Sequence, residues 1–303
     1  MEKTVRETIK EIVRGHLVEE KSMCFGQCLT AVGWVGGTLP ELYEEDGMIE
    51  VATSDVANGG FVVGAGLKGI RPIYVVRYQG FQWYNAPIIV NYACKSKEIW
   101  DVPCPIFIRS IAMEGAIGPV AGSSHHSLFQ RMPGSKIISP MTPNEYKYAY
   151  DEFMKDDDVY YISEHRRSYD NTKEMQNVIK ENADFTLFPI SITRFDAEKA
   201  RLILEEQGYK INIIHQLWIK PFEFKDEWKK ALNDSKYGGM VLDDDYEEGA
   251  ASSIAHTMMI SANKKVHTMG LDHRTAGFHP DVDNLPPTPD AIVNRVKSII
   301  NGK

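Results

Sequence analysis

The sequence lacks several features that mark special classes of protein. No run of 18 apolar residues occurs among its 303 residues, so no segment is expected to span a bilayer. The N-terminal segment MEKTVRETIKEIVRGHL is a charged amphipathic helix without the apolar core of a secretory signal. The four cysteines form no CxxC pair and are too few for a disulfide scaffold, which favours buried, reduced thiols in a cytoplasmic protein.

An excess of positive charge is also missing. The chain has 34 Lys and Arg against 42 Asp and Glu, and the formal net charge is −8 with both signs interspersed. This balance argues against nucleic acid or an anionic membrane as the main partner. No internal repeat or low-complexity tract is present, so the length predicts a globular protein with two domains.

Short apolar runs alternate with helical patterns along the chain. Several runs are apolar throughout, as expected for strands that are covered on both faces. The sequence therefore predicts an α/β fold with mostly parallel sheets covered by helices. Strands are expected at 48–52, 73–76, 106–108, 136–139, 159–162, 185–193, 211–214, 240–243 and 266–269, and helices at 3–20, 58–69, 82–99, 143–155, 196–208, 224–234, 249–261 and 288–301.

The most informative stretch runs from Glu50 to Lys95. Asp55 stands at the N-terminus of a predicted helix with closely spaced glycines, where the helix dipole favours an ionised acid. A short apolar strand follows, and then an aromatic cluster: Tyr78, Phe81, Trp83 and Tyr84. An acid and stacking aromatics in a tightly packed seam suit a flat heteroaromatic ring whose nitrogen must be protonated.

This stretch resembles the beta subunit of 2-oxo acid dehydrogenase decarboxylating components, in the transketolase-like, thiamine diphosphate-dependent family. The pattern aligns without a gap, with Gly64, Gly69, Arg71, Pro72, Phe81, Asn91, Ala93 and Lys95 in register. The resemblance implies a pyrimidine-binding domain at 1–184, with a polar linker from about 166, and a transketolase C-terminal-like domain at 185–303. In that second domain, His215 and Leu217 replace the aspartate and arginine that are common in the family.

The resemblance implies a cofactor site around Asp55. In the family a glutamate at this position hydrogen-bonds the cofactor's aminopyrimidine and thereby activates the thiazolium carbon. Aspartate is one methylene shorter, so we expect a retained but altered role. Tyr78 and Phe81 are expected to pack on the ring. The alternatives are a helix N-cap at Ser54 and Asp55, and core or interface packing for the neighbouring aromatics.

A second candidate lies in the Gly- and Ser-rich segment GAIGPVAGSSHHS. It resembles the family loop that carries a catalytic histidine, with His125 matching one version of the motif and His126 the other. An imidazole is suited to proton transfer near neutral pH. A loop histidine pair without a function is the alternative. Ala121, or Gly122, stands where true transketolases carry an aspartate that reads a sugar hydroxyl, and this favours a 2-oxo acid substrate.

The family's Gly-Asp-Gly signature of the diphosphate and metal site is absent, and no metal ligand set is recognisable. The resemblance therefore implies that this chain binds only the pyrimidine end of thiamine diphosphate. An alpha-type subunit would carry the diphosphate-binding domain and Mg²⁺, in an α2β2 heterotetramer with contact between the beta subunits.

The expected function is decarboxylation of a 2-oxo acid and transfer of the acyl or aldehyde unit. The nearest alternative is the C-terminal-half subunit of a split transketolase-like enzyme acting on sugars, and another is a non-catalytic partner subunit. A glycosyltransferase using Asp243 and Asp245 of an Asp-x-Asp motif is a further class. We discount it because an acidic run between a strand end and a helix start needs no metal.

Overall fold

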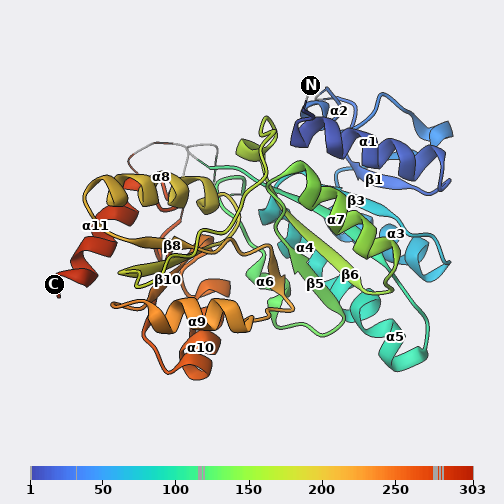
Figure 1. Ribbon diagram of the computed structural model, residues 1–303. Coiled ribbons are helices and arrows are strands. Elements are labelled where there is room, and N and C mark those ends of the chain that lie inside the picture. The colour runs from blue at the N-terminus through green and yellow to red at the C-terminus, as the bar shows by residue number, and fades with distance from the viewer. Residues whose placement is uncertain are drawn as a thin grey trace. The chain divides into compact units, whose positions relative to one another are not determined.

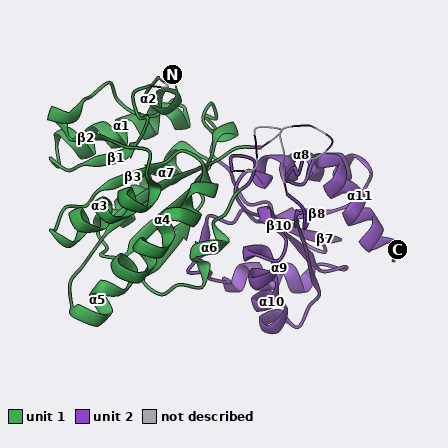
Figure 2. Cartoon of the chain, turned by 180° about the vertical axis from the view of Figure 1, so that it is seen from behind, with its two compact units in different colours: residues 1–113, 124–174 green, residues 114–123, 175–303 purple. Residues whose placement is uncertain are grey.

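The computed structural model describes residues 2–31, 33–114, 118, 120–275, 279, 281 and 283–302. The chain divides into two compact units, of which unit 1 comprises residues 1–113 and 124–174 and unit 2 comprises residues 114–123 and 175–303 (Figure 2). None of the helices in the described ranges combines the length and the apolar character that crossing a bilayer requires. The predicted boundary between 184 and 185 stays a prediction.

Unit 1 is a parallel sheet covered by helices on both faces (Figure 1). Within this unit the strand order is β2-β1-β3-β4-β6-β5, and every neighbouring pair is parallel. The strands are β1 Cys24–Gln27, β2 Met48–Val51, β3 Ile73–Val76, β4 Ile106–Ala112, β5 Ser135–Ile138 and β6 Val159–His165. The helices are α1 Val5–Val18, α2 Gly33–Gly37, α3 Asp55–Leu67, α4 Gln82–Ile88, α5 Cys94–Trp100, α6 Ser127–Gln130 and α7 Pro143–Met154, with short turns η1 Glu44–Asp46, η2 Gln79–Phe81, η3 Ile89–Ala93 and η4 Arg166–Ser168.

Alternation along β4 shows which helix covers which face. Successive strand residues point to opposite faces. The Phe107 ring packs against Tyr150 and Phe153 of α7. Ile106, one position earlier, lies on the side of α3, because a Cβ added at Gly66 would come within 3.6 Å of its Cγ1. The two helices therefore cover opposite faces of the sheet.

The glycines of α3 serve two different purposes. A side chain at Gly66 would meet the sulfur of Cys104 at 2.7 Å, and one at Gly59 would meet Cβ of Asn85 in α4 at 3.1 Å. These two glycines permit close packing of the helix. A Cβ added at Gly60 or Gly64 would meet no atom within 4 Å beyond the adjacent backbone of its own helix, and both glycines are exposed. The outward glycines are not explained by the packing of unit 1.

The predicted helix at 82–99 is broken into three parts. Pro87 lies inside α4, and a π-helical turn, η3, separates α4 from α5. Proline cannot donate the backbone hydrogen bond of a regular helix, and a π-turn is a frequent local adjustment. The periodicity of the sequence predicted the helical segment correctly but not its interruption.

Unit 2 has the same construction with a smaller sheet. Its strand order is β11-β10-β7-β8, again with all pairs parallel. Figure 1 shows α8 and α11 on one side of this sheet and α9 and α10 on the other. The elements are β7 Phe185–Pro189, α8 Thr193–Glu206, β8 Ile211–Ile213, β9 Trp218–Lys220, α9 Asp226–Asp234, β10 Gly239–Tyr246, α10 Ala250–Ala262, β11 Val266–Leu271 and α11 Pro289–Ile300. The predicted α/β fold with parallel, helix-covered sheets is confirmed.

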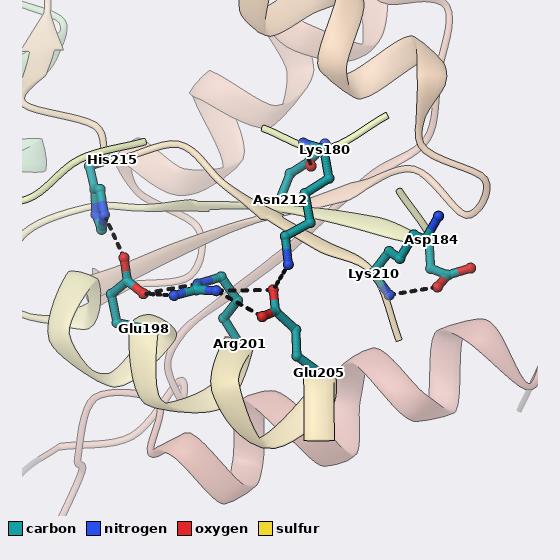
Figure 3. Close-up of polar contacts among 8 residues, drawn as sticks. All are labelled: Lys180, Asp184, Glu198, Arg201, Glu205, Lys210, Asn212 and His215. Atoms are coloured by element: carbon teal, nitrogen blue, oxygen red, sulfur yellow. Dashed lines mark hydrogen bonds and ion pairs between the residues drawn. The ribbon is translucent and has the colours of Figure 1, made fainter. Parts of the chain in front are cut away.

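A chain of polar contacts joins His215 to α8 (Figure 3). Nε2 of His215 lies 3.2 Å from Oε1 of Glu198, and Nη2 of Arg201 lies 2.9 Å from Oε2 of that carboxylate. Arg201 also pairs with Glu205 at 3.0 Å, and Glu205 in turn pairs with Lys180. His215, which stands where the family commonly has aspartate, thus anchors the segment after β8 to the helix and serves the structure of unit 2.

A buried histidine makes the stability of the chain depend on pH. His16 in α1 is fully buried, its Nδ1 lies 2.9 Å from the hydroxyl of Tyr150, and burial lowers its pKa to about 4. Below its unfolded pKa of 6.5 the unfolded chain therefore binds a proton that the native state does not. Acidification from pH 7.5 to 5.0 should thus lower the free energy of unfolding by about 2 kcal/mol through this group.

The measurement is the urea midpoint at both pH values for the native sequence and for His16→Gln. The variant should lose about 2 kcal/mol less on acidification. If both proteins lose the same free energy, His16 is not the group responsible.

Candidate active site

The candidate residues of unit 1 follow the carboxyl ends of its parallel strands. Asp55 comes shortly after β2, Tyr78 two residues after β3, and the histidine pair after β4. In open parallel sheets this edge is the usual place for ligand binding, because the loops that leave the strands converge there. Residues Gly115 to Ile117 and Pro119 of the predicted histidine loop lie outside the described residues.

Asp55 is the first residue of α3 and is half-buried. The N-cap residue is Ser54, whose side chain makes no capping hydrogen bond. Burial raises the pKa of the Asp55 carboxyl, and the side chain of Gln27 at the end of β1 opposes that rise. The negative charge of Asp55 in turn adds to the effect of burial in raising the pKa of Tyr74. The site therefore holds a carboxyl group that keeps a proton more readily than a solvated aspartate does.

A buried glutamine organises the centre of the site. Gln79 is fully buried, and its Nε2 donates to Ser163 Oγ at 2.9 Å and to the carbonyl oxygen of Ser110 at 3.2 Å. Its Oε1 accepts the backbone N–H of His125 at 2.7 Å and lies 3.1 Å from the Tyr161 hydroxyl. Gln79 thus ties the histidine loop to β4 and β6.

Sequence reasoning missed Gln79 as a functional residue. The available signal was an amide side chain in the otherwise apolar and aromatic stretch between β3 and α4. Buried amides need hydrogen-bond partners. The sequence therefore indicated a polar network at this place but not which residues form it.

The two histidines of the loop differ in burial. His126 is fully buried, and its Nδ1 lies 3.1 Å from Ser163 Oγ. His125 is half-buried, and its ring meets Trp83 edge-on with the centroids 6.1 Å apart. An imidazole at the surface of the site can exchange protons with a ligand, whereas a fully buried one positions its neighbours. This geometry favours His125 for proton transfer.

The aromatic cluster also divides into two groups. Tyr78 and Phe81 are half-buried and in mutual contact, with ring centroids 5.9 Å apart and planes inclined at 47°. Trp83 and Tyr84 expose 59% and 56% of their surface, so they do not belong to the core of unit 1. Tyr78 and Phe81 are therefore the pair able to flank a ring, and the other two remain available to a partner.

A model of the transketolase pyrimidine-binding domain matches residues 5–172. The chain belongs to this family. It is 26% identical over 271 residues to the beta subunit of 2-oxoisovalerate dehydrogenase of Bacillus subtilis, which covers 83% of this chain and 80% of that subunit. It is 24% identical over 246 residues to the pyruvate dehydrogenase E1 beta subunit of Acholeplasma laidlawii, with 73% of each chain covered.

The fold of this pyrimidine-binding family member also matches a solved structure along its whole length. A split-gene transketolase, an inactive beta4 tetramer, superimposes with a TM-score of 0.71 at 15% identity and with 98% of each chain covered. The similarity shows the shared fold. The match to the family model and the similarity to the two beta subunits confirm, at the level of the family, the resemblance that the sequence predicted.

The acidic run near the end of β10 is buried rather than open to solvent. Asp243 and Asp244 are buried, and Asp243 Oδ1 accepts the backbone N–H of Asp244 at 2.8 Å. Asp244 Oδ2 accepts the hydroxyl of Ser191 at 3.0 Å. The carboxylates of this family member satisfy the chain's own donors at a strand end, which does not favour the glycosyltransferase alternative.

Proposed function

We propose that the chain is the beta-type subunit of a thiamine diphosphate-dependent enzyme that decarboxylates a 2-oxo acid and transfers the acyl or aldehyde unit. The observation that carries the proposal is the half-buried Asp55 carboxyl at the carboxyl edge of a parallel sheet, in a chain of the pyrimidine-binding family. The relatives named for oxo acid substrates support the substrate class.

The residues of the site fit the aminopyrimidine end of the cofactor. Asp55 offers a carboxyl that can share a proton with a ring nitrogen, and Tyr78 and Phe81 offer half-buried ring faces. Thiamine diphosphate, when bound, supplies the carbanion chemistry. Asp55 would hold the proton at a carboxyl oxygen, and the two aromatic rings would orient the pyrimidine and exclude water.

His125 would move protons at a ring nitrogen. Gln79 holds its backbone and Trp83 covers one edge of its ring, so the imidazole has a defined position. An ordinary imidazole changes its charge near neutral pH and can therefore serve a substrate oxygen as donor or acceptor. His126 would act through Ser163 as a positioning residue.

An exposed apolar surface supports the need for a partner subunit. Along α3 the side chains of Val56 and Phe61 expose 54% and 61% of their surface, next to the outward-facing Gly60. A groove of about 450 Å³ is lined by residues of α4, η3 and α6, including Trp83 and Leu128. Apolar surface of this kind marks contact sites between proteins. We propose an α2β2 heterotetramer in the cytoplasm, in which the alpha-type subunit holds Mg²⁺ and the diphosphate.

Binding of the cofactor tests the proposal. The chain should be co-expressed with an alpha-type subunit that carries the Gly-Asp-Gly signature, and thiamine diphosphate binding should be measured by calorimetry with and without Mg²⁺. We expect Mg²⁺-dependent binding by the complex and none by the isolated chain. A complex that forms but binds no thiamine diphosphate would contradict the proposal.

The second candidate is a subunit of a split transketolase-like enzyme. It is favoured by the match to the split-gene transketolase over 98% of both chains. Against it stands Ala121, a buried apolar residue at the place where transketolases carry an aspartate for a sugar hydroxyl. Assays of the complex with ketose donors and with 2-oxo acids separate the two functions.

A further inference from the structure

A cavity of about 140 Å³ lies in unit 1, beside segments that follow the carboxyl ends of its strands. Among its lining residues are Gly36, Arg77, Tyr78, Arg166 and Tyr169. Arg77 directly follows β3, and Arg166 directly follows β6. The cavity therefore opens at the same edge of the sheet as the proposed cofactor site, and Tyr78 belongs to both.

Two arginines give this cavity its charge. Within the described residues, neither Arg77 nor Arg166 forms an ion pair with a carboxylate. The Arg77 guanidinium lies 5.7 Å from the ring centroid of Tyr78, and Arg166 Nη1 contacts the sulfur of Met113 at 3.0 Å. A thioether is only a weak acceptor. Both guanidinium groups thus retain strong donors for a ligand.

Two other charged pairs lie close to the cavity. Arg6 pairs with Asp170 at 2.8 Å and also donates to the backbone of the α2 turn. Tyr169 donates to Glu164 at 2.9 Å, and Glu164 pairs with Arg109 at 2.7 Å. Among the residues that the structure describes, the cavity therefore keeps two guanidinium groups without a carboxylate partner, in a chain whose net charge is −8.

Guanidinium groups are the preferred protein donors for carboxylate and phosphate oxygens, because their planar fork matches both oxyanions. Two fixed cations would not accelerate the loss of a carboxylate as CO₂, because they stabilise the ground state, in which the carboxylate carries its full charge. An anionic group that does not react is held equally throughout the reaction. Two arginines at the wall of the site thus suit a distal anion.

We infer that this cavity binds a second anionic group of the substrate, a carboxylate or phosphate remote from the reacting carbon. Arg77 and Arg166 are its ligands and set the specificity for dianionic donors. The inference rests on the proposed function for the identity of the substrate, but the anion site itself is a property of this chain.

The first test uses the full chain alone and inorganic phosphate as the probe. Calorimetry at low ionic strength should show phosphate binding that weakens by about 10-fold or more in Arg77→Gln and in Arg166→Gln, since each removes a charge-assisted hydrogen bond. Arg131→Gln removes the same charge from an exposed position outside the cavity and should leave the affinity unchanged. Equal phosphate affinity in all four proteins would overturn the inference.

The second test uses the assembled enzyme. The ratio of kcat/KM for 2-oxoglutarate to kcat/KM for 2-oxovalerate, which has the same chain length and a neutral end, should fall by about 10- to 100-fold in Arg77→Gln. The ratio should stay constant in Arg131→Gln. A constant ratio in Arg77→Gln would overturn the assignment of the substrate. If the complex binds no thiamine diphosphate, the proposed function fails while the phosphate titration still decides the anion site.

Discussion

Replacing Asp55 with asparagine should lower the turnover of the assembled enzyme by about 10²- to 10⁴-fold, the range expected when a placed acid–base group is removed. The amide keeps the size of the side chain but cannot hold and release a proton in the manner of a carboxyl group. Burial raises the pKa of Asp55, so the group already deviates from a solvated aspartate in the direction that this role requires. Steady-state rates with saturating thiamine diphosphate and Mg²⁺ provide the measurement.

Asp101→Asn is the matched control for this prediction. Asp101 is exposed at the end of α5 and adopts a left-handed conformation that asparagine also tolerates, so the same loss of charge should leave turnover unchanged. The Asp55→Glu variant distinguishes a retained catalytic site from a decayed one. We expect this variant to lower activity, because the side chain of Gln27 contacts the shorter carboxylate of Asp55 and a glutamate would disturb that contact. A large gain instead would indicate a decayed site and a non-catalytic subunit.

Replacing Glu164 with glutamine should reduce the free energy of unfolding by about 3–5 kcal/mol, the effect of leaving one charge of a buried pair uncompensated. Both side chains of the Arg109–Glu164 pair are at most 1% exposed. Nε and Nη2 of Arg109 donate to the two carboxylate oxygens at 2.7 and 3.0 Å, and Nη1 is buried without a hydrogen-bond partner. The variant keeps the shape of the side chain but removes the charge that holds the guanidinium. Urea denaturation of the full chain measures the loss.

The double variant Arg109→Met with Glu164→Leu separates charge from packing. Replacing a whole buried pair by apolar residues is often neutral, so the double variant should be more stable than Glu164→Gln. A double variant that is as unstable as the single one would show that packing, not the uncompensated charge, causes the loss. A change of less than about 1 kcal/mol in the single variant would contradict the prediction directly.

The strand ends show most clearly where prediction from the sequence stopped. The apolar runs at 106–108 and 159–162 predicted the cores of β4 and β6, but these strands continue to Ala112 and His165. The added residues include Ser110 and Glu164, which are polar and fully buried. Their hydrogen-bond partners come from distant parts of the chain, and a local pattern cannot show that a polar residue will be compensated.

Strand β1 was missed for a related reason. Its sequence, Cys-Phe-Gly-Gln, is short and contains one strongly strand-favouring residue, Phe25, while Gly26 weakens it. The strand exists because it pairs with β2 on one side and β3 on the other. A Cβ at Gly26 would lie 2.9 Å from the carbonyl oxygen of Val75, so glycine is required by the approach of a backbone that is far away in the sequence.

The sequence by itself determined the alternation of strands and helices, the acid four residues after β2, and the membership of the family, because periodicity, helix starts and ordered motifs are local properties of the chain. Only the tertiary structure decided that His126 is buried while His125 is not, that Gln79 connects the site, and that two arginines share a cavity. These properties depend on contacts between residues that are distant in sequence, where burial and the supply of hydrogen-bond partners set the energy of each polar group.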